Sequence, residues 1–263
     1  MRRLQLFELT ELTACPASLR DAVRDALQFI ACLGDHYVGC ANRIRLALSR
    51  VARPRVIDLC SGSGGPWLRL ARLVQGHEQA AVEILLSDKQ PNVAAWRWVS
   101  ARTAGRVSYL TEPVDVLQLP GDLGGLRTLF TAFHHFRPAE AQAILRETVR
   151  QGAGIGIFEV TGRQPRALLA VLTAPLLLLV LMPFIRPFRW SRLFWTYPVP
   201  VAPLALGFDG LVSCLRTYSP AELRELVAGI AAPGYVWEIG REQTGGGWSL
   251  PVTYLVGYPR QET

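Results

Sequence analysis

The first residues along the chain that could do chemistry lie in a glycine turn, which follows a short apolar, β-branched segment. This turn reads Asp58-Leu-Cys-Ser-Gly-Ser-Gly-Gly65, and Pro66 opens a stretch whose apolar residues recur at helical spacing. Glycine accepts positive φ and lets a ligand approach the backbone, while a helix start offers unpaired N–H groups at the positive end of its dipole. The combination predicts a site for an anionic or polar cofactor. A dinucleotide fingerprint would read G-x-G-x-x-G, and this turn does not.

The turn resembles motif I of class I S-adenosylmethionine (SAM) dependent methyltransferases, D/E-x-G-x-G-x-G, with Cys60 in place of the first glycine. The resemblance implies that SAM is the cofactor. It also implies contacts from the turn itself, through Asp58, Cys60, Ser61, Gly62, Ser63 and Gly64. Without the resemblance, the turn could hold another nucleotide or simply connect a strand to a helix, and Cys60 is then a small packing residue.

Two acidic residues follow the next two predicted strands. Residues 81–87 are rich in Val, Ile and Leu, as a buried parallel strand should be, and they lead to Asp88. An acid at this strand end is where such folds accept ribose hydroxyls. After a strand at 107–110, the resemblance implies that Asp115 accepts a hydrogen bond from the adenine amino group, with Val116 beside the ring. Taken alone, Asp115 is more often a turn residue. The cofactor contacts predicted outside the turn are Asp88, Lys89, Asp115, Val116 and Phe133.

Two histidines and a glutamate lie at the ends of later strands. A predicted strand over 126–133 leads directly to His134 and His135, and a strand over 155–160 carries Glu159 near its tip. Strand tips at this edge of an open α/β sheet face the ligand crevice. Histidine titrates near neutral pH and can take a proton from an alcohol or phenol. If the chain is still extended there, the two histidines point to opposite faces. All three are catalytic candidates, and the alternative is that they only shape the pocket or pair with an arginine.

The elements that must position these residues alternate as β-α-β-α-β-β-α-β, the doubly wound α/β pattern. A capping box at Ser219 then predicts a helix, and strands at 235–242 and 252–258, joined by a glycine-rich connection over 245–248, should be antiparallel. The resemblance implies a Rossmann-like, seven-stranded sheet with helices on both faces and an antiparallel last strand. We predict an N-terminal helical cap over 1–52 and a SAM-binding methyltransferase domain over 53–263.

An apolar insertion over 164–216 separates strand five from the later helix. Residues 167–185 carry no charge, a run long enough for a transmembrane candidate, and arginines and aromatic residues flank it. A single span is excluded because both flanks belong to one sheet, and Pro175 and Pro183 are expected to break a straight helix. Only a hairpin or a segment lying on the membrane surface would keep both flanks on one side of a membrane. The segment 167–206 is therefore predicted as a monotopic membrane patch or a lid over the acceptor site, and the two can coincide. The lid either packs on its own protein or also touches a membrane surface.

Composition narrows the possible partners. The chain has 263 residues, half of them hydrophobic, and a net charge of +7 with its arginines spread along the sequence. Without a polybasic run, nucleic acid is disfavoured as a partner. Five scattered cysteines without C-x-x-C indicate reduced thiols rather than disulfides or a metal site. No secretion signal is visible. We expect a cytoplasmic protein, peripheral at the inner face of the membrane if the lid touches lipid.

These observations predict a SAM-dependent methyltransferase acting on a hydrophobic small-molecule or lipid-like acceptor. The amide-methyltransferase signature N/D-P-P-Y/F is absent after the fourth strand, which disfavours DNA adenine and protein glutamine substrates. The acceptor, the attacked atom and the oligomeric state stay open at this point. The alternative is a SAM-binding protein of the same fold without methyl transfer, either a cyclase-like enzyme or a membrane-associated scaffold.

Overall fold

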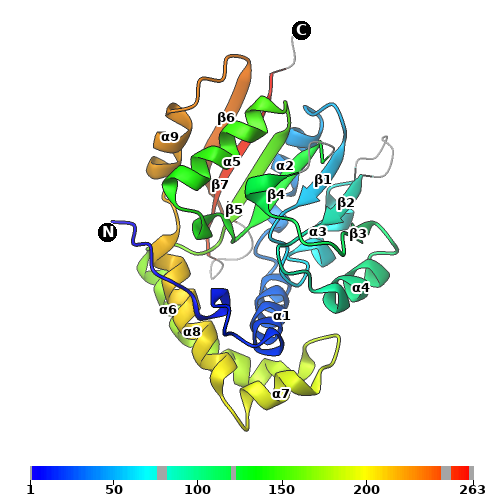
Figure 1. Ribbon diagram of the computed structural model, residues 1–263, viewed down its shortest axis with the longest axis vertical. Helices are drawn as coiled ribbons and strands as arrows, with labels where there is room; N and C mark the ends of the chain where they lie inside the picture. Colours follow the sequence, from blue (N-terminus) through cyan, green and yellow to red (C-terminus); the bar gives the residue numbers. More distant parts are fainter. Residues whose placement is uncertain (1, 76–81, 120–122, 244–249, 261–263) are drawn as a thin grey trace.

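A computed structural model describes residues 2–75, 82–119, 123–243 and 250–260 (Figure 1). A sheet of seven strands runs through these residues in the order β3-β2-β1-β4-β5-β7-β6. The strands are β1 (Arg55–Asp58), β2 (Glu83–Leu86), β3 (Val107–Tyr109), β4 (Leu126–Phe130), β5 (Gly154–Glu159), β6 (Tyr235–Glu242) and β7 (Val252–Pro259). The glycine-rich connection at 245–248 lies outside the described residues.

The helices are α1 (Ala17–Leu33), α2 (Ala41–Leu48), α3 (Trp67–Leu73), α4 (Val93–Arg102), α5 (Pro138–Arg150), α6 (Pro165–Leu181), α7 (Trp190–Thr196), α8 (Val201–Arg216) and α9 (Pro220–Ala228). Short 3₁₀ turns are η1 (Leu9–Glu11), η2 (Val38–Cys40), η3 (Val116–Gln118), η4 (Phe133–His135) and η5 (Met182–Phe184). The helix α9 begins with the predicted capping box, in which Ser219 and Glu222 each accept the other's backbone N–H.

Strand directions follow the prediction. The strands β1 to β5 pair in parallel, whereas β7 pairs antiparallel with both β5 and β6. One apolar layer buries α2, α3 and α4 against the sheet, and a second layer on the opposite face buries α5 and α9. The α/β fold with helices on both faces and an antiparallel strand near its edge is confirmed. Parallel strands end at one edge, so the turns after β1, β2, β4 and β5 are brought together there.

Within the predicted cap over 1–52, the α-helices are α1 and α2, and the first of them begins at Ala17. Residues 2–16, the N-terminal segment, contain no α-helix and only the turn η1. This segment is tied to α8 instead: the Leu4 N–H donates to the Leu215 carbonyl at 3.1 Å, and the Leu9 N–H donates to the Asp209 carboxylate at 2.6 Å. Backbone N–H groups that would begin a helix are thus satisfied by a carboxylate far along the chain.

The insertion forms α6, α7 and α8, which extend away from the sheet in Figure 1. A third apolar cluster joins them to α1, with Val23, Ala26, Leu178 and Leu206 among its buried members. The expectation that Pro175 breaks the helix is wrong, because α6 runs through it. The opposing helix leaves room for the ring: a Cβ on Gly207 would lie 2.9 Å from the Pro175 Cγ.

Candidate active site

The glycine turn after β1 has the backbone that its sequence predicts. Gly62 and Gly64 have φ of 54° and 103°, and Cys60 also adopts a positive φ of 54°. The Ser61 hydroxyl donates to the Asp58 carbonyl at 2.8 Å, and the Ser61 N–H donates to the carbonyl of Ser87, beyond β2, at 3.0 Å. The turn is therefore fixed to two neighbouring strands before any ligand arrives.

Asp88 lies directly against this turn. Its Oδ2 accepts the Gly62 N–H at 2.9 Å, and its Oδ1 accepts the Gln90 N–H at 2.8 Å. The carboxylate is nearly buried, and Arg24 of α1 approaches its Oδ1 to 3.8 Å. A buried carboxylate with free lone pairs beside a glycine turn fits the predicted role toward a ribose. A Cβ on Gly62 would meet only Arg24, at 3.9 Å, within a 4 Å radius.

Asp58 is placed differently from a ligand contact. Its side chain is buried beneath the turn, where the Thr128 hydroxyl donates to its Oδ1 at 2.7 Å. Burial raises the pKa of Asp58 to about 6, against the hydrogen bond from Thr128. This carboxylate links β1 to β4 and supports the turn from below. Its position suits an organising role rather than the direct cofactor contact expected from the sequence.

The other predicted cofactor residues divide between an open edge and the core. Lys89 is exposed and pairs with Asp115 at 2.8 Å, while Asp115 also caps η3 by accepting the Leu117 N–H at 3.0 Å. Val116 is buried in the same turn. Phe133 is also buried, and its ring packs against Tyr218 with 5.6 Å between centroids. The structure thus gives Phe133 a packing role.

A buried polar cluster connects the turn to the insertion. The Asp25 cluster consists of Asp25 on α1, Ser63 in the turn, Asn92 at the start of α4 and Arg192 on α7. The Ser63 hydroxyl donates to Asp25 Oδ1 at 2.6 Å, and the Asn92 amide donates to the same oxygen at 3.2 Å. Arg192 donates to the other oxygen at 2.5 Å. All four side chains are buried. The Asp25 carboxylate therefore ties α1 to three other segments of the chain.

At the tips of β4 and β5, His134 and Glu159 form a buried pair. The His134 Nδ1 lies 2.8 Å from Glu159 Oε2, and the His134 backbone N–H donates to Glu159 Oε1 at 3.2 Å. The glutamate therefore fixes both the ring and its backbone. The His134 Nε2 is buried, lies 3.5 Å from Glu8 Oε1 and has no hydrogen-bond partner among the described residues. When the imidazole is neutral, this nitrogen can accept a proton.

His135 has a different partner from His134, and the extended backbone that would point the two histidines to opposite faces is not present. Residues 133–135 form the turn η4 instead of an extended strand, so the rings of His134 and His135 lie 4.3 Å apart rather than on opposite faces. The His135 Nδ1 pairs with Glu11 at 2.5 Å, and its side chain is one-third exposed. Of the three catalytic candidates, the structure brings together His134 and Glu159 and separates His135 from Glu159.

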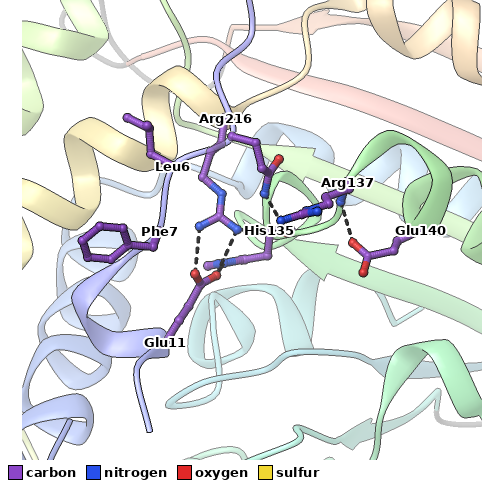
Figure 2. A pocket seen from close by; sticks show the side chains of 8 residues that line it. Leu6, Phe7, Glu11, His135, Arg137, Glu140 and Arg216 are labelled. Carbon is purple, nitrogen blue, oxygen red and sulfur yellow. Dashed lines mark hydrogen bonds and ion pairs between the residues drawn. The ribbon is translucent and has the colours of Figure 1, made fainter. Parts of the chain in front are cut away.

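His135 lines a cavity of about 520 Å³ between the N-terminal segment and the start of α5. Figure 2 shows the Arg216 guanidinium and the Glu11 carboxylate pointing toward one another, joined at 3.0 Å. Leu6 and Phe7 supply apolar walls, and the full lining is Gln5, Leu6, Phe7, Glu11, His135, Arg137, Glu140 and Arg216.

Charges around His134 are balanced within a short radius. The His134 cluster consists of Glu8, His134, Glu159 and Arg216, with Arg216 3.4 Å from Glu8. Burial alone would lower the pKa of His134, but the Glu159 and Glu8 carboxylates outweigh it and raise the pKa to about 9. Both carboxyl pKa values are correspondingly lowered, against the effect of burial. The imidazole is therefore cationic at neutral pH in this arrangement.

Glu8, His134 and His135 also place potential metal-ligand atoms within 4.8 Å of one another. Two imidazoles and a carboxylate are a donor set that suits several divalent metals. Arg216 already neutralises Glu8 from 3.4 Å, and Glu159 holds the first histidine, so the local charges are paired without an ion.

The sequence matches no family model and no curated protein. Solved structures do match. An O-methyltransferase of neocarzinostatin biosynthesis, in complex with SAM and 2-hydroxy-5-methyl naphthoic acid, has a TM-score of 0.53 at 16% identity, covering 92% of this chain and 58% of its own. A Nostoc punctiforme protein assigned as an O-methyltransferase has a TM-score of 0.51 at 15% identity, covering 98% of this chain and 64% of its own.

The chain has the class I methyltransferase fold. It spans about three fifths of the length of these solved proteins. Within this fold the glycine turn and the His134–Glu159 pair lie at the same edge of the sheet, beyond β1 and β4.

Sequence reasoning missed the residues that complete both clusters. Glu8 and Arg216 lie in segments that were read as helical cap and apolar insertion, and Asp25 lies on α1 within the predicted cap. The one usable signal was Asp209, an acid inside an otherwise apolar run, which turns out to bind the N-terminal segment. A single acid among apolar residues usually has a partner when it is buried.

Proposed function

We propose that this chain is a SAM-dependent methyltransferase that methylates a hydroxyl group of a hydrophobic small molecule. The observation that carries the proposal is the His134–Glu159 pair, with Nδ1 held at 2.8 Å and Nε2 without a hydrogen bond among the described residues, 3.5 Å from Glu8. A base whose ring is oriented by a carboxylate is the arrangement needed to deprotonate an alcohol or phenol. The pair lies in a methyltransferase fold, at the sheet edge that carries the glycine turn.

The residues present fit SAM as the cofactor. The turn offers positive-φ glycines, and the Asp88 carboxylate faces it from the end of β2 with one donor on each oxygen. Asp88 would hold the ribose hydroxyls and Asp115 the adenine edge. When bound, SAM supplies an electrophilic methyl group on a sulfonium centre. The protein's own contribution is alignment of the two reactants and removal of the acceptor proton.

His134 removes that proton at Nε2, while Glu159 stabilises the imidazolium that results. Only the neutral imidazole can act, so the raised pKa of about 9 makes the reaction favour alkaline solution. The nitrogen is buried, so some of the side chains that cover it must move before an acceptor hydroxyl reaches it. Glu8 lies 3.5 Å from Nε2 and is the side chain that must move away.

Support for a hydrophobic acceptor comes from the surroundings and from the matched structures. The insertion and α1 present an apolar cluster next to the Asp25 cluster and hence to the turn. The neocarzinostatin-pathway enzyme was solved with 2-hydroxy-5-methyl naphthoic acid and with 1,4-dihydroxy-2-naphthoic acid. Hydroxylated bicyclic aromatic acids are therefore the first acceptors to assay with this chain.

A second candidate is a SAM-binding protein of this fold without methyl transfer. It is favoured by one observation: Glu8 and Arg216 from distant segments cover His134, whose side chain is 1% exposed. If that cover never opens, the protein binds SAM and transfers nothing.

The test combines turnover with cofactor binding. The wild-type chain is incubated with SAM and a panel of hydroxylated aromatic acids, and S-adenosylhomocysteine and methylated product are measured by mass spectrometry. His134→Gln should lower turnover by roughly 10²- to 10⁴-fold, the usual contribution of a general base. Calorimetry should show unchanged SAM affinity in that variant. His135→Gln, the adjacent ring held by Glu11, is the matched comparison and should lose much less.

Asp88→Ala addresses the cofactor separately. Loss of a charged hydrogen-bond acceptor should weaken SAM binding by roughly tenfold or more. Unchanged affinity would remove the ribose assignment. SAM binding with no product from any acceptor would favour the second candidate, and full activity in His134→Gln would exclude this histidine as the base.

A further inference from the structure

We propose that α6, η5 and α7 form a surface that lies in the headgroup region of an anionic membrane. The starting observation is the segment formed by α6 and η5, Pro165–Phe184. It is 20 residues long with a mean hydropathy of 2.5, and only 17% of its 18-residue apolar stretch is buried in the protein. A core helix of a soluble protein with this hydropathy would be covered on all sides. The surface stands apart from the catalytic proposal, because it is tested by binding and not by turnover.

One face of α6 is apolar and uncovered along its whole length. The exposed side chains recur at helical spacing and form the apolar face: Leu169, Leu172, Leu176, Leu177, Leu179, Val180 and, in η5, Phe184. Thr173 is the one polar residue among them, and its hydroxyl donates back to the Leu169 carbonyl at 3.1 Å. The hydroxyl of this threonine is therefore already bonded to the backbone of its own helix.

The opposite face of α6 already has its partners. Ala167 and Leu178 are buried, and the helix packs closely on α8, where a Cβ on Gly210 would come within 2.8 Å of Val171. The apolar face is thus not needed to hold the insertion together. Apolar patches of this extent on soluble proteins usually mark an interaction site.

The apolar face continues beyond the end of α6 with aromatic residues. Trp190 is 78% exposed, and Phe184, Phe188, Phe194 and Tyr197 are also exposed around η5 and α7. Trp and Tyr favour the interface between lipid chains and headgroups, where one side of the ring is apolar and the other is wet.

Charge favours an anionic lipid over a second copy of the chain. No acidic residue occurs between Glu159 and Asp209, whereas five arginines do. Three of these are used inside the protein, as Arg163 pairs with Glu222, Arg189 with Asp21 and Arg192 with Asp25. Arg166 and Arg186, at the two ends of the apolar face, are exposed and have no ion-pair partner among the described residues. A face bordered by arginines attracts anionic lipid headgroups and repels the same face on a second copy of the chain.

The helix lies on the membrane instead of crossing it. α6 leaves from β5, and α8 returns toward α9 and β6, so both ends remain beside the sheet. The inner part of α8 carries buried Asp209 and Arg216, which the N-terminal segment holds. Surface insertion of one apolar helix face satisfies these constraints.

Vesicle flotation tests the proposal with the full-length wild-type chain. It should float with vesicles of phosphatidylcholine and phosphatidylglycerol, less with phosphatidylcholine alone, and less again at high salt. The double variant Leu172→Gln/Leu176→Gln removes two exposed leucines and should weaken vesicle binding by at least tenfold. Leu46→Gln/Leu73→Gln changes two exposed leucines on α2 and α3 and is the control, with binding unchanged.

Further measurements separate the other outcomes. Arg166→Glu/Arg186→Glu should abolish the preference for anionic vesicles while leaving the melting temperature unchanged. Light scattering without lipid reports self-association. If wild type does not float but forms a dimer that Leu172→Gln/Leu176→Gln dissociates, a second copy covers the face and the lipid proposal is overturned. Equal flotation of that variant and wild type overturns it as well.

Discussion

The His134 cluster and the Asp25 cluster are both buried, charged and assembled from distant parts of the chain, yet they differ in one respect. Both oxygens of Asp25 receive strong donors, from Ser63 on one side and Arg192 on the other. Each cluster leaves one buried nitrogen without a hydrogen-bond partner among the described residues, His134 Nε2 in the first and Arg192 Nε in the second. A neutral imidazole nitrogen can accept a proton, whereas a guanidinium can neither accept nor release one near neutral pH. The proposed chemistry therefore belongs to the first cluster, and the second serves attachment between segments.

The largest expected effect comes from breaking the attachment. Asp25→Asn keeps the shape of the side chain but leaves the Arg192 guanidinium buried without a counter-charge. The free energy of unfolding should fall by about 3–5 kcal/mol, the usual result of removing one partner from a buried ion pair. Urea denaturation followed by circular dichroism measures this.

Asp21→Asn is the matched control for that variant. Asp21 lies on the same helix and pairs with Arg189 at 2.9 Å, but its side chain is 28% exposed. Because this pair is only partly buried, its loss should cost clearly less than the loss of Asp25. Equal losses for the two variants would show that the Asp25 cluster is no more important than a partly buried ion pair.

The pH dependence of turnover tests the His134 cluster. His134 accepts a proton only when neutral, so turnover should rise with pH through the pKa of about 9. Glu8 is one of the two carboxylates that raise this pKa, and Glu8→Gln removes its charge. The midpoint of the turnover profile should move to lower pH by roughly one unit or more, the usual effect of a nearby opposite charge. Activity at neutral pH then increases.

The control here is Glu11→Gln, which removes the carboxylate paired with His135 and leaves Glu8 in place. Its profile should shift much less. A midpoint that stays fixed in Glu8→Gln, with turnover otherwise intact, would show that His134 does not limit the reaction through its protonation state.

Signals within a few residues of one another were sufficient to predict most of the sheet. The turn after Asp58 and the capping box at Ser219 each depend on local geometry, and each has the predicted structure. Local patterns of this kind carry their own physical cause, since a positive φ or a helix cap is decided by neighbouring residues.

The chemistry was harder to predict, because its partners are remote. His134 was named from its place at a strand end, but Glu8 approaches it from more than a hundred residues earlier. The fourth strand was expected to run to residue 133, and the turn η4 there reverses the expected orientation of the histidines. Pro175 was read by its intrinsic preference, whereas α6 runs through it and packs its ring against α8 at Gly207. Tertiary packing decided each of these cases.

The smallest effect is expected where an ion pair lies outside both clusters. Lys89 and Asp115 meet at 2.8 Å, the same separation as His134 and Glu159, but the lysine side chain is 74% exposed. Water screens this pair, so Lys89→Ala should change the free energy of unfolding by less than about 1 kcal/mol. Asp115 keeps its hydrogen bond from the Leu117 N–H, so the cap of η3 should survive. If Lys89→Ala lowers the free energy of unfolding as much as Asp25→Asn does, then the distance between the charges, and not their burial, decides how much an ion pair stabilises this protein.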